Sequence, residues 1–185
     1  MPLSFVARGD IVLFNEVMKD ADLRSTYPVW FEKMVRSECR DAGFCKVEHG
    51  DSVLIIDQNP KRILSCIRRI TRSLRDHAFP RTIRFGIASG IIDFYATAGG
   101  REPLGLALRL AARIEPRAPD GCILATKDFA EQVNPDREIA AGFALATEKT
   151  VSTLSYVGTQ AVVQKDDTGR DPPELHELWV APCRP

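Results

Sequence analysis

The sequence has no excess of either charge, no long hydrophobic run and no recognisable secretory leader. Lys plus Arg number 25 and Asp plus Glu number 25 among 185 residues, so the basic excess typical of nucleic-acid-binding proteins is missing. No apolar stretch approaches the roughly 18 residues that a membrane span needs, and the first residues lack the basic and apolar regions of a signal peptide. We therefore expect no nucleic-acid partner, no membrane segment in this chain and a cytoplasmic location.

Cysteines are few, and their spacing indicates neither a disulfide framework nor a metal site. The five lie at positions 39, 45, 66, 122 and 183, an odd number without a C-x-x-C pair. This predicts reduced thiols that pack as small apolar groups. A hydrophobic content of 44% over this length is enough for one core without such cross-links. We expect a single domain over residues 1–185.

Apolar periodicity predicts alternating strands and helices. Strands are expected at residues 3–14, 44–47, 52–56, 82–92, 122–125 and 175–180, and helices at 27–41, from Pro60 onward, at 103–115 and at 127–133. The two strands on either side of His49-Gly50-Asp51 form a predicted hairpin. The resulting order favours an α+β fold with helices on one face of a sheet, in which a ferredoxin-like βαββαβ core is extended by further elements.

The helix predicted over residues 103–115 is apolar around most of its circumference. Leucines, alanines and an isoleucine cover it, and only Arg109 and Arg113 interrupt them. Such a helix needs cover on most sides, either from its own sheet and neighbouring elements or from a second subunit. The two arginines are four residues apart and project from one face. They are placed to meet an anion, or they form a narrow solvent stripe paired with Glu102 or Glu115.

Two aspartates follow glycines at the ends of predicted strands. Asp10 comes after Gly9 in the first strand, and Asp51 comes after Gly50 at the hairpin. A Gly-Asp pair alone is most often a turn. Two carboxylates that meet at strand ends also suit a hard cation such as Mg²⁺, whose remaining ligands are water and phosphate oxygens.

Six segments, in this order along the chain, resemble the catalytic domain of class III adenylate and guanylate cyclases. They are Asp10-Ile11-Val12-Leu13-Phe14, His49-Gly50-Asp51, and the runs RFGIASG at 84–90, GLALRLAAR at 105–113, APDGCIL at 118–124 and ELHELW at 174–179. Each segment alone is weakly specific, but their common order makes the resemblance strong. It covers most of the chain and implies the nucleotide cyclase fold.

The resemblance implies that a dimer converts ATP or GTP to a cyclic nucleotide and pyrophosphate by two-metal catalysis. The dimer would be a homodimer or a heterodimer with another cyclase domain. Asp10 and Asp51 would hold two Mg²⁺ or Mn²⁺ ions, and the turn after Asp10, which ends at Phe14, would bind the nucleotide. Arg113 would reach the site of the partner subunit and stabilise the transition state.

The first metal ligand has an alternative. If residues 11–14 are themselves the buried strand, Glu16 takes the ligand position. We favour Asp10 because D-I-V-x-F matches the family over more positions, and because its separation from Asp51 is closer to that of the family.

Several positions depart from the family pattern. Arg109 replaces an Asn that works with Arg113, Val47 replaces the base-selecting Lys, and Glu102 replaces the second base-selecting residue, usually Asp or Thr. Leu13 replaces a glycine whose backbone lies near phosphate. The phosphate-binding Lys would fall on Val162, and Lys165 is in a different register.

These departures leave two functional hypotheses open. The chain is an active nucleotide cyclase, or it is a catalytically inactive cyclase homology domain that acts as a dimerisation, nucleotide-binding or regulatory module. An unrelated ferredoxin-like RNA-binding domain is disfavoured by the zero net charge and by the lack of an aromatic pair on a central strand.

Overall fold

The computed structural model describes residues 2–133, 155–162 and 174–182. Within them, a seven-stranded sheet has the order β2-β3-β1-β4-β7-β9-β8, and a separate hairpin pairs β5 with β6. The elements are β1 (Ser4–Ile11), α1 (Phe14–Lys19), α2 (Ala21–Glu38), β2 (Phe44–Glu48), β3 (Ser52–Asp57), α3 (Pro60–Arg75), β4 (Ile83–Gly90), β5 (Asp93–Thr97), β6 (Gly100–Leu104), α4 (Leu106–Ile114), a 3₁₀ turn (Glu115–Arg117), β7 (Cys122–Thr126), α5 (Lys127–Val133), β8 (Ser155–Val162) and β9 (Glu174–Pro182).

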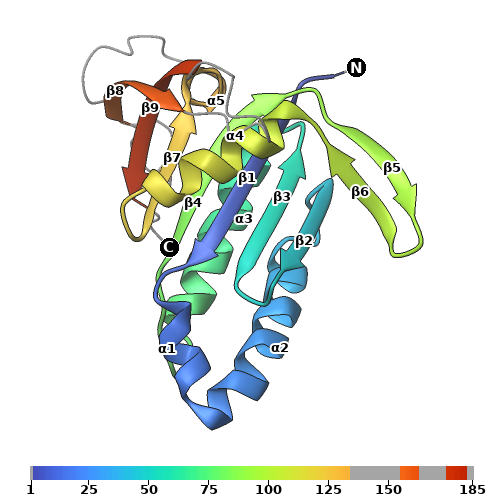
Figure 1. Cartoon of the computed structure of the whole chain (residues 1–185), viewed down its shortest axis with the longest axis vertical. Coiled ribbons are helices and arrows are strands. Elements are labelled where there is room, and N and C mark those ends of the chain that lie inside the picture. Colours follow the sequence, from blue (N-terminus) through green and yellow to red (C-terminus); the bar gives the residue numbers. More distant parts are fainter. Residues whose placement is uncertain (1, 134–154, 163–173, 183–185) are drawn as a thin grey trace, which may run out of the picture.

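The predicted ferredoxin-like core is confirmed. Strands β1 to β4 are antiparallel neighbours in the order β2-β3-β1-β4, and α2 and α3 pack on the same face. Strand β7 joins β4 in parallel and extends the sheet. The β5–β6 hairpin projects away from the sheet as an arm (Figure 1).

Each face of the sheet has its own core. Alternate residues of the strands, such as Phe5, Ile55 and Phe85, join Phe31 of α2 and other buried side chains in a first core on the α2–α3 side. The other alternate residues, such as Val6 and Leu54, pack with α4 in a second core. Figure 1 shows α4 crossing the face opposite to α2 and α3. The expectation that helices lie on one face only is therefore wrong, since α4 covers the second face.

Helix α4 also corrects the predicted helix over residues 103–115. It begins at Leu106, because residues 100–104 form strand β6. Its buried side chains are Ala107, Ala111 and Ile114, whereas Leu104 and Leu106 are 59% and 68% exposed. The helix is thus covered by its own sheet along one stripe, while Leu106 at its start and Leu104 at the end of β6 are exposed.

Two glycines of β4 bring α4 close to the sheet. A Cβ atom at Gly86 would lie 2.3 Å from the backbone oxygen of Ala111 and 2.4 Å from the backbone nitrogen of Glu115. A Cβ at Gly90 would lie 3.0 Å from the Cβ of Ala107. Glycine is therefore required at Gly86 by close approach of two backbones.

Helix α2 begins earlier than the predicted residue 27. The side chain of Asp20 accepts hydrogen bonds from the backbone N–H groups of Asp22 and Leu23, which caps a helix start that the apolar pattern did not indicate. Pro28 lies inside the same helix. Cys39, Cys45, Cys66 and Cys122 are free thiols, while Cys183 is outside the described residues. Among the described helices, none has the length and apolar character needed to span a membrane.

Candidate functional site

A row of polar residues crosses four strands on the face that carries α4. Strand pairing aligns Glu48 of β2 with Ser52 of β3, Ser52 with Asp10 of β1, and Asp10 with Arg84 of β4. Side chains two residues apart share a face, so Arg8 and Lys46 belong to the next row on that face. Register thus brings polar groups from four separate strands together.

Asp10 and Asp51 meet at the hydroxyl of Ser52. The Ser52 Oγ lies 2.9 Å from Asp10 Oδ1 and 3.5 Å from Asp51 Oδ1. The backbone N–H of Ile11 also donates to the carbonyl oxygen of Asp51 at 3.2 Å. The hairpin turn reaches this position because His49 and Gly50 adopt positive φ angles of 53° and 87°. The two sequence-predicted aspartates are therefore neighbours.

The Asp51 carboxyl group is in an unfavourable place for a bare negative charge. Desolvation raises its pKa above the usual value, and the nearby charge of Asp10 raises it further. Paired carboxylates of this kind fit a hard divalent cation, which would neutralise both. Among the described residues, no group of three or more His, Cys, Asp or Glu side chains is placed to hold a metal ion. A cation held by Asp10 and Asp51 would thus keep open positions for water and phosphate oxygens.

Arg84 links the carboxylate pair to the end of α4. Its Nε donates to Glu115 Oε1 at 2.6 Å, and its Nη2 lies 3.7 Å from Asp10 Oδ2. Desolvation raises the pKa of Glu115, and the hydrogen bond from Arg84 opposes that shift. Arg84 therefore keeps a buried carboxylate paired and stands beside Asp10 as a fixed positive charge.

Leu13, where the sequence departs from the family motif, lies in the turn after β1. Leu13 has φ 57° and ψ 34°, a left-handed conformation that favours glycine. Its side chain is 70% exposed. Leu13 thus stands in a backbone conformation that favours the glycine of the family motif.

Glu16 and Phe14 lie away from the carboxylate pair. Glu16 belongs to α1, where its Oε1 pairs with Lys19 Nζ at 2.8 Å. Phe14 packs against the first core, with its ring centroid 6.4 Å from that of Tyr27. The structure therefore brings Asp10, rather than Glu16, to Asp51, and the Phe14 side chain packs against the first core.

Of the two predicted base-selecting residues, Glu102 forms an ion pair with Lys46, a residue that the motif comparison did not indicate. Lys46 Nζ lies 2.6 Å from Glu102 Oε1, and Glu102 raises the pKa of Lys46. Val47 instead packs against the first core, on the opposite face of β2. The two-residue period of strand side chains could have identified Lys46. It places Lys46 with Phe44 and Glu48 on the face of the sheet that carries α4.

The α4 arginines differ in their surroundings. Arg109 is exposed and Arg113 is half-buried. The glutamates expected as their partners have other contacts, since Glu102 pairs with Lys46 and Glu115 with Arg84. Val162 ends β8, while Lys165 is outside the described residues.

Comparison of sequence alone finds no match: no protein-family model and no curated protein matches this chain. Solved structures do match over nearly the whole chain. The guanylyl cyclase domain of the RhoGC fusion protein from the fungus Blastocladiella emersonii, described as a non-canonical dimer, has a TM-score of 0.73 at 12% identity and covers 98% of this chain and 96% of its own. The guanylate cyclase domain of RhGC from Catenaria anguillulae, in complex with GTP, has a TM-score of 0.72 at 12% identity, with 100% and 98% covered.

A bacterial structure matches in the same way. The adenylyl cyclase CyaB of P. aeruginosa has a TM-score of 0.68 at 16% identity and covers 97% of this chain and 93% of its own. At such identities the likeness establishes the fold alone.

Proposed function

Since the chain has the fold of class III adenylyl and guanylyl cyclase catalytic domains, we propose that it is a nucleotide cyclase domain that works as a dimer. It converts ATP or GTP to a cyclic nucleotide and pyrophosphate. The observation that carries the proposal is the meeting of Asp10 and Asp51 at the Ser52 hydroxyl. The GTP complex and the dimer among the structural neighbours support a nucleoside triphosphate and self-association.

The reaction forms one P–O bond and breaks another. The ribose 3′ oxygen attacks the α-phosphorus, the bond from that phosphorus to the bridging oxygen of the β-phosphate breaks, and pyrophosphate leaves as the 3′ hydroxyl gives up its proton. Two Mg²⁺ or Mn²⁺ ions, when bound, neutralise charge on the attacking and leaving oxygens. Asp10 and Asp51 would hold them, and Ser52 and Arg84 orient the Asp10 carboxylate by contacts to its two oxygens.

The purine is bound by the Lys46–Glu102 pair. An ammonium and a carboxylate side by side supply donors and an acceptor for the edge of a purine base. Both side chains are partly exposed, at 39% and 30%, so a base can reach them. This pair takes over the role that the family comparison assigned to Val47 and Glu102.

The partner subunit supplies the remaining groups. Helix α4 carries Arg109 and Arg113 beside the exposed Leu104 and Leu106. Burial of those leucines against a second copy, or against another cyclase domain, would favour association. Arg113 of one subunit then approaches the triphosphate bound to the other and balances the charge that develops in the transition state.

A catalytically inactive domain is the second candidate, and two observations favour it. Arg109 stands where the family has a neutral amide, and the exposed Leu13 side chain occupies a turn that favours glycine. Loss of one transition-state contact costs roughly 10²-fold to 10³-fold in rate. The cyclase activity we propose is accordingly low, and a fully inactive member would retain dimerisation and nucleotide binding as its role.

The test is to incubate the purified protein with ATP or GTP and Mn²⁺ or Mg²⁺ and to identify cyclic nucleotide by chromatography and mass spectrometry. We expect product that Asp10→Asn and Asp51→Asn abolish. Glu32→Gln, which changes an exposed acid on α2, is the matched control and leaves the rate unchanged. A wild-type protein that forms no product with either nucleotide and either metal contradicts the proposal and leaves the inactive domain.

A further inference from the structure

Three cysteines from three different elements form a cluster in the first core. Cys39 follows the last residue of α2, Cys45 belongs to β2 and Cys66 belongs to α3. The thiol of Cys39 is hydrogen-bonded to those of both Cys45 and Cys66. Cys39 and Cys66 are buried, and Cys45 is half-buried. All three are free thiols, and none of the roles proposed above uses them.

Arg69 holds its guanidinium against the sulfur of Cys66. Its Nη2 lies 3.3 Å from Cys66 Sγ, and its Nε donates to the backbone carbonyl oxygen of Glu38 at 2.7 Å. The same Nη2 forms an ion pair with Asp41, whose Oδ1 lies 3.8 Å from the Cys66 sulfur. Cys66 therefore faces a cation that two other groups keep in position.

These contacts favour the thiolate form of Cys66, which is the form that reacts with oxidants. The hydrogen bond from Cys39 has the largest effect on the pKa of Cys66 and lowers it, and the charge of Arg69 lowers it further. Burial and the charges of Asp41 and Asp57 act in the opposite direction, but the pKa is lowered on balance. Hydrogen bonds to the neighbouring thiols raise the pKa of Cys39. Cys66 thus ionises more readily, and Cys39 remains a protonated thiol beside it.

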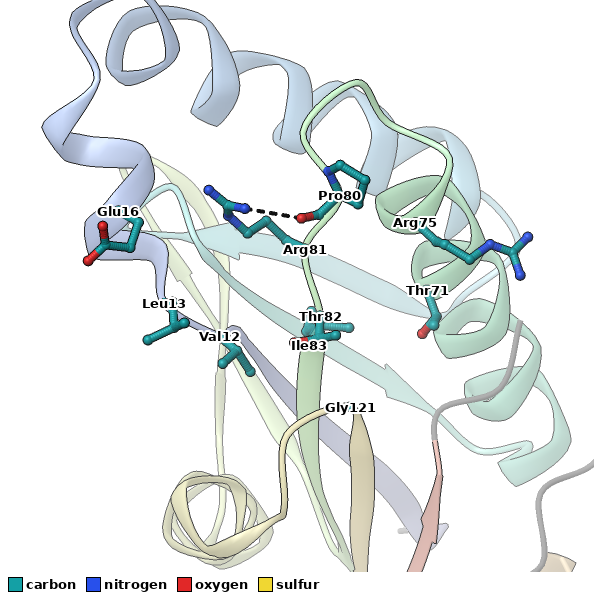
Figure 2. Close-up of a pocket in the computed structure, with 10 residues that line it drawn as sticks. All are labelled: Val12, Leu13, Glu16, Thr71, Arg75, Pro80, Arg81, Thr82, Ile83 and Gly121. Carbon is teal, nitrogen blue, oxygen red and sulfur yellow. Dashed lines mark hydrogen bonds between the residues drawn. The ribbon is translucent and has the colours of Figure 1, made fainter.

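A small cavity leads toward the Cys66 sulfur. It has a volume of about 280 Å³ and is lined by Ser37, Glu38, Arg40, Asp41 and Arg69. The last two also contact the sulfur, and their side chains are 47% and 37% exposed. An ion pair this exposed contributes little stability, so its opening admits a molecule as small as hydrogen peroxide. The larger cavity beside the turn after β1, of about 440 Å³ (Figure 2), has no cysteine among the described residues that line it and offers no such route.

We propose that a hydroperoxide oxidises Cys66 and that Cys39 then forms a disulfide with it. With hydrogen peroxide, the Cys66 thiolate attacks one oxygen, the O–O bond breaks, hydroxide leaves and Cys66 becomes a sulfenic acid. The Cys39 sulfur then attacks the Cys66 sulfur, the S–O bond breaks, and the hydroxyl group leaves as water with the proton of Cys39. Both sulfurs are oxidised, and the peroxide is reduced to water and hydroxide. The new bond links the end of α2 to α3.

The test is to treat the purified, reduced protein with hydrogen peroxide, alkylate the remaining thiols and digest with trypsin without reductant. Trypsin cleaves after Arg and Lys, so the three cysteines fall in separate peptides, 37–40, 41–46 and 63–68. We expect mass spectrometry to find 37–40 joined to 63–68 and dithiothreitol to reverse the link. A link of 37–40 to 41–46 in its place, or no link within the cluster, overturns the proposal.

Substitution of Arg69 tests the cause of the reactivity. Loss of the opposite charge lowers the thiolate fraction of Cys66 at a given pH, and the greater reactivity of a more basic thiolate offsets only part of that loss. Arg69→Gln should therefore slow formation of the link by about threefold, whereas Arg69→Lys, which keeps the charge, should restore most of the rate. Arg72→Gln, exposed on the same helix, is the matched control. An unchanged or faster rate in Arg69→Gln contradicts the proposal.

A trapping experiment identifies the sulfur that is oxidised first. In Cys39→Ser, the sulfenic acid has no thiol to close on, so dimedone should label Cys66, and a label on Cys45 instead would refute the assignment. Cys122→Ser, which removes a half-buried thiol outside the cluster, should leave the Cys39–Cys66 link unchanged. Thermal melts in reductant verify that each variant folds, and the peptide map of the wild type needs no variant. These measurements require neither nucleotide nor metal, so they do not depend on cyclase activity.

Discussion

Substitution of Gly86 by alanine is expected to separate α4 from the sheet. The new Cβ would lie 2.3 Å and 2.4 Å from two backbone atoms of the Ala111–Glu115 segment, and backbone atoms cannot rotate away as a side chain can. Restoring normal contact distances requires the helix to move by about 1 Å. That movement loosens the second core, in which Ala107, Ala111 and Ile114 are buried.

Overpacking of this kind costs about 1–3 kcal/mol, and more when backbone must move. We therefore expect Gly86→Ala to lower the free energy of unfolding by about 3 kcal/mol. For a chain of this length, that corresponds to a fall in Tm of roughly 6–12 °C. The measurement is thermal unfolding followed by circular dichroism or calorimetry.

Gly99→Ala is the matched control for this change. Gly99 lies in the tip of the β5–β6 hairpin, without a positive φ, and the nearest atom to a Cβ there is 3.9 Å away. Its Tm should stay close to that of the wild type, within about 0.5 kcal/mol of stability. A Gly86→Ala protein that melts together with this control would refute the close packing of α4 on β4.

Three further substitutions test the site. Asp51→Asn should raise Tm at pH 7 without metal, because the raised pKa of Asp51 means that folding disfavours its charged form. The difference in Tm should vanish as the pH falls and the wild-type carboxyl becomes protonated, and a constant difference across a pH series of melts would argue against that origin. Leu13→Gly should raise cyclase turnover or nucleotide affinity by relieving a left-handed strain of about 1–2 kcal/mol and removing an exposed side chain, whereas Leu13→Ala, which keeps the strain, should raise them less; equal kinetics for the two would exclude strain as the cause. Lys46→Met should weaken binding of ATP or GTP in an equilibrium titration, and an equal loss in Val47→Ala would contradict the assignment of Lys46 to the base.

The proximity of Asp10 and Asp51 was predictable because both follow glycines at strand ends, and strand pairing brings these ends together. A Gly-Asp step at the end of a strand and another at a hairpin tip place Asp10 and Asp51 at one edge, and register then brings Ser52 between them. The ferredoxin-like core followed from helix and strand periodicity for the same reason, since each signal is local.

Other features depend on contacts that periodicity does not encode. The β5–β6 hairpin was missed because Pro103 and Leu104 continue the apolar pattern of the helix that follows. Lys46 was missed because motif alignment pointed to Val47, while only the face of the strand decides which residue reaches Glu102. The close packing of α4 depends on the lack of side chains at Gly86 and Gly90. Two glycines in a strand do not change the apolar periodicity, so the sequence pattern does not indicate this packing.

We propose that each active site lies between two subunits, with Asp51 from one and Arg113 from the other. The most direct test mixes two variants, Asp51→Asn and Arg113→Ala, each of which is expected to be inactive alone. In a mixed dimer, one site has both defects and the other has none. Random exchange of subunits makes half of the dimers mixed, so cyclic nucleotide formation should recover to about a quarter of the wild-type rate. A mixture that stays as inactive as its components, while the wild type is active and exchange is verified, would contradict the shared site.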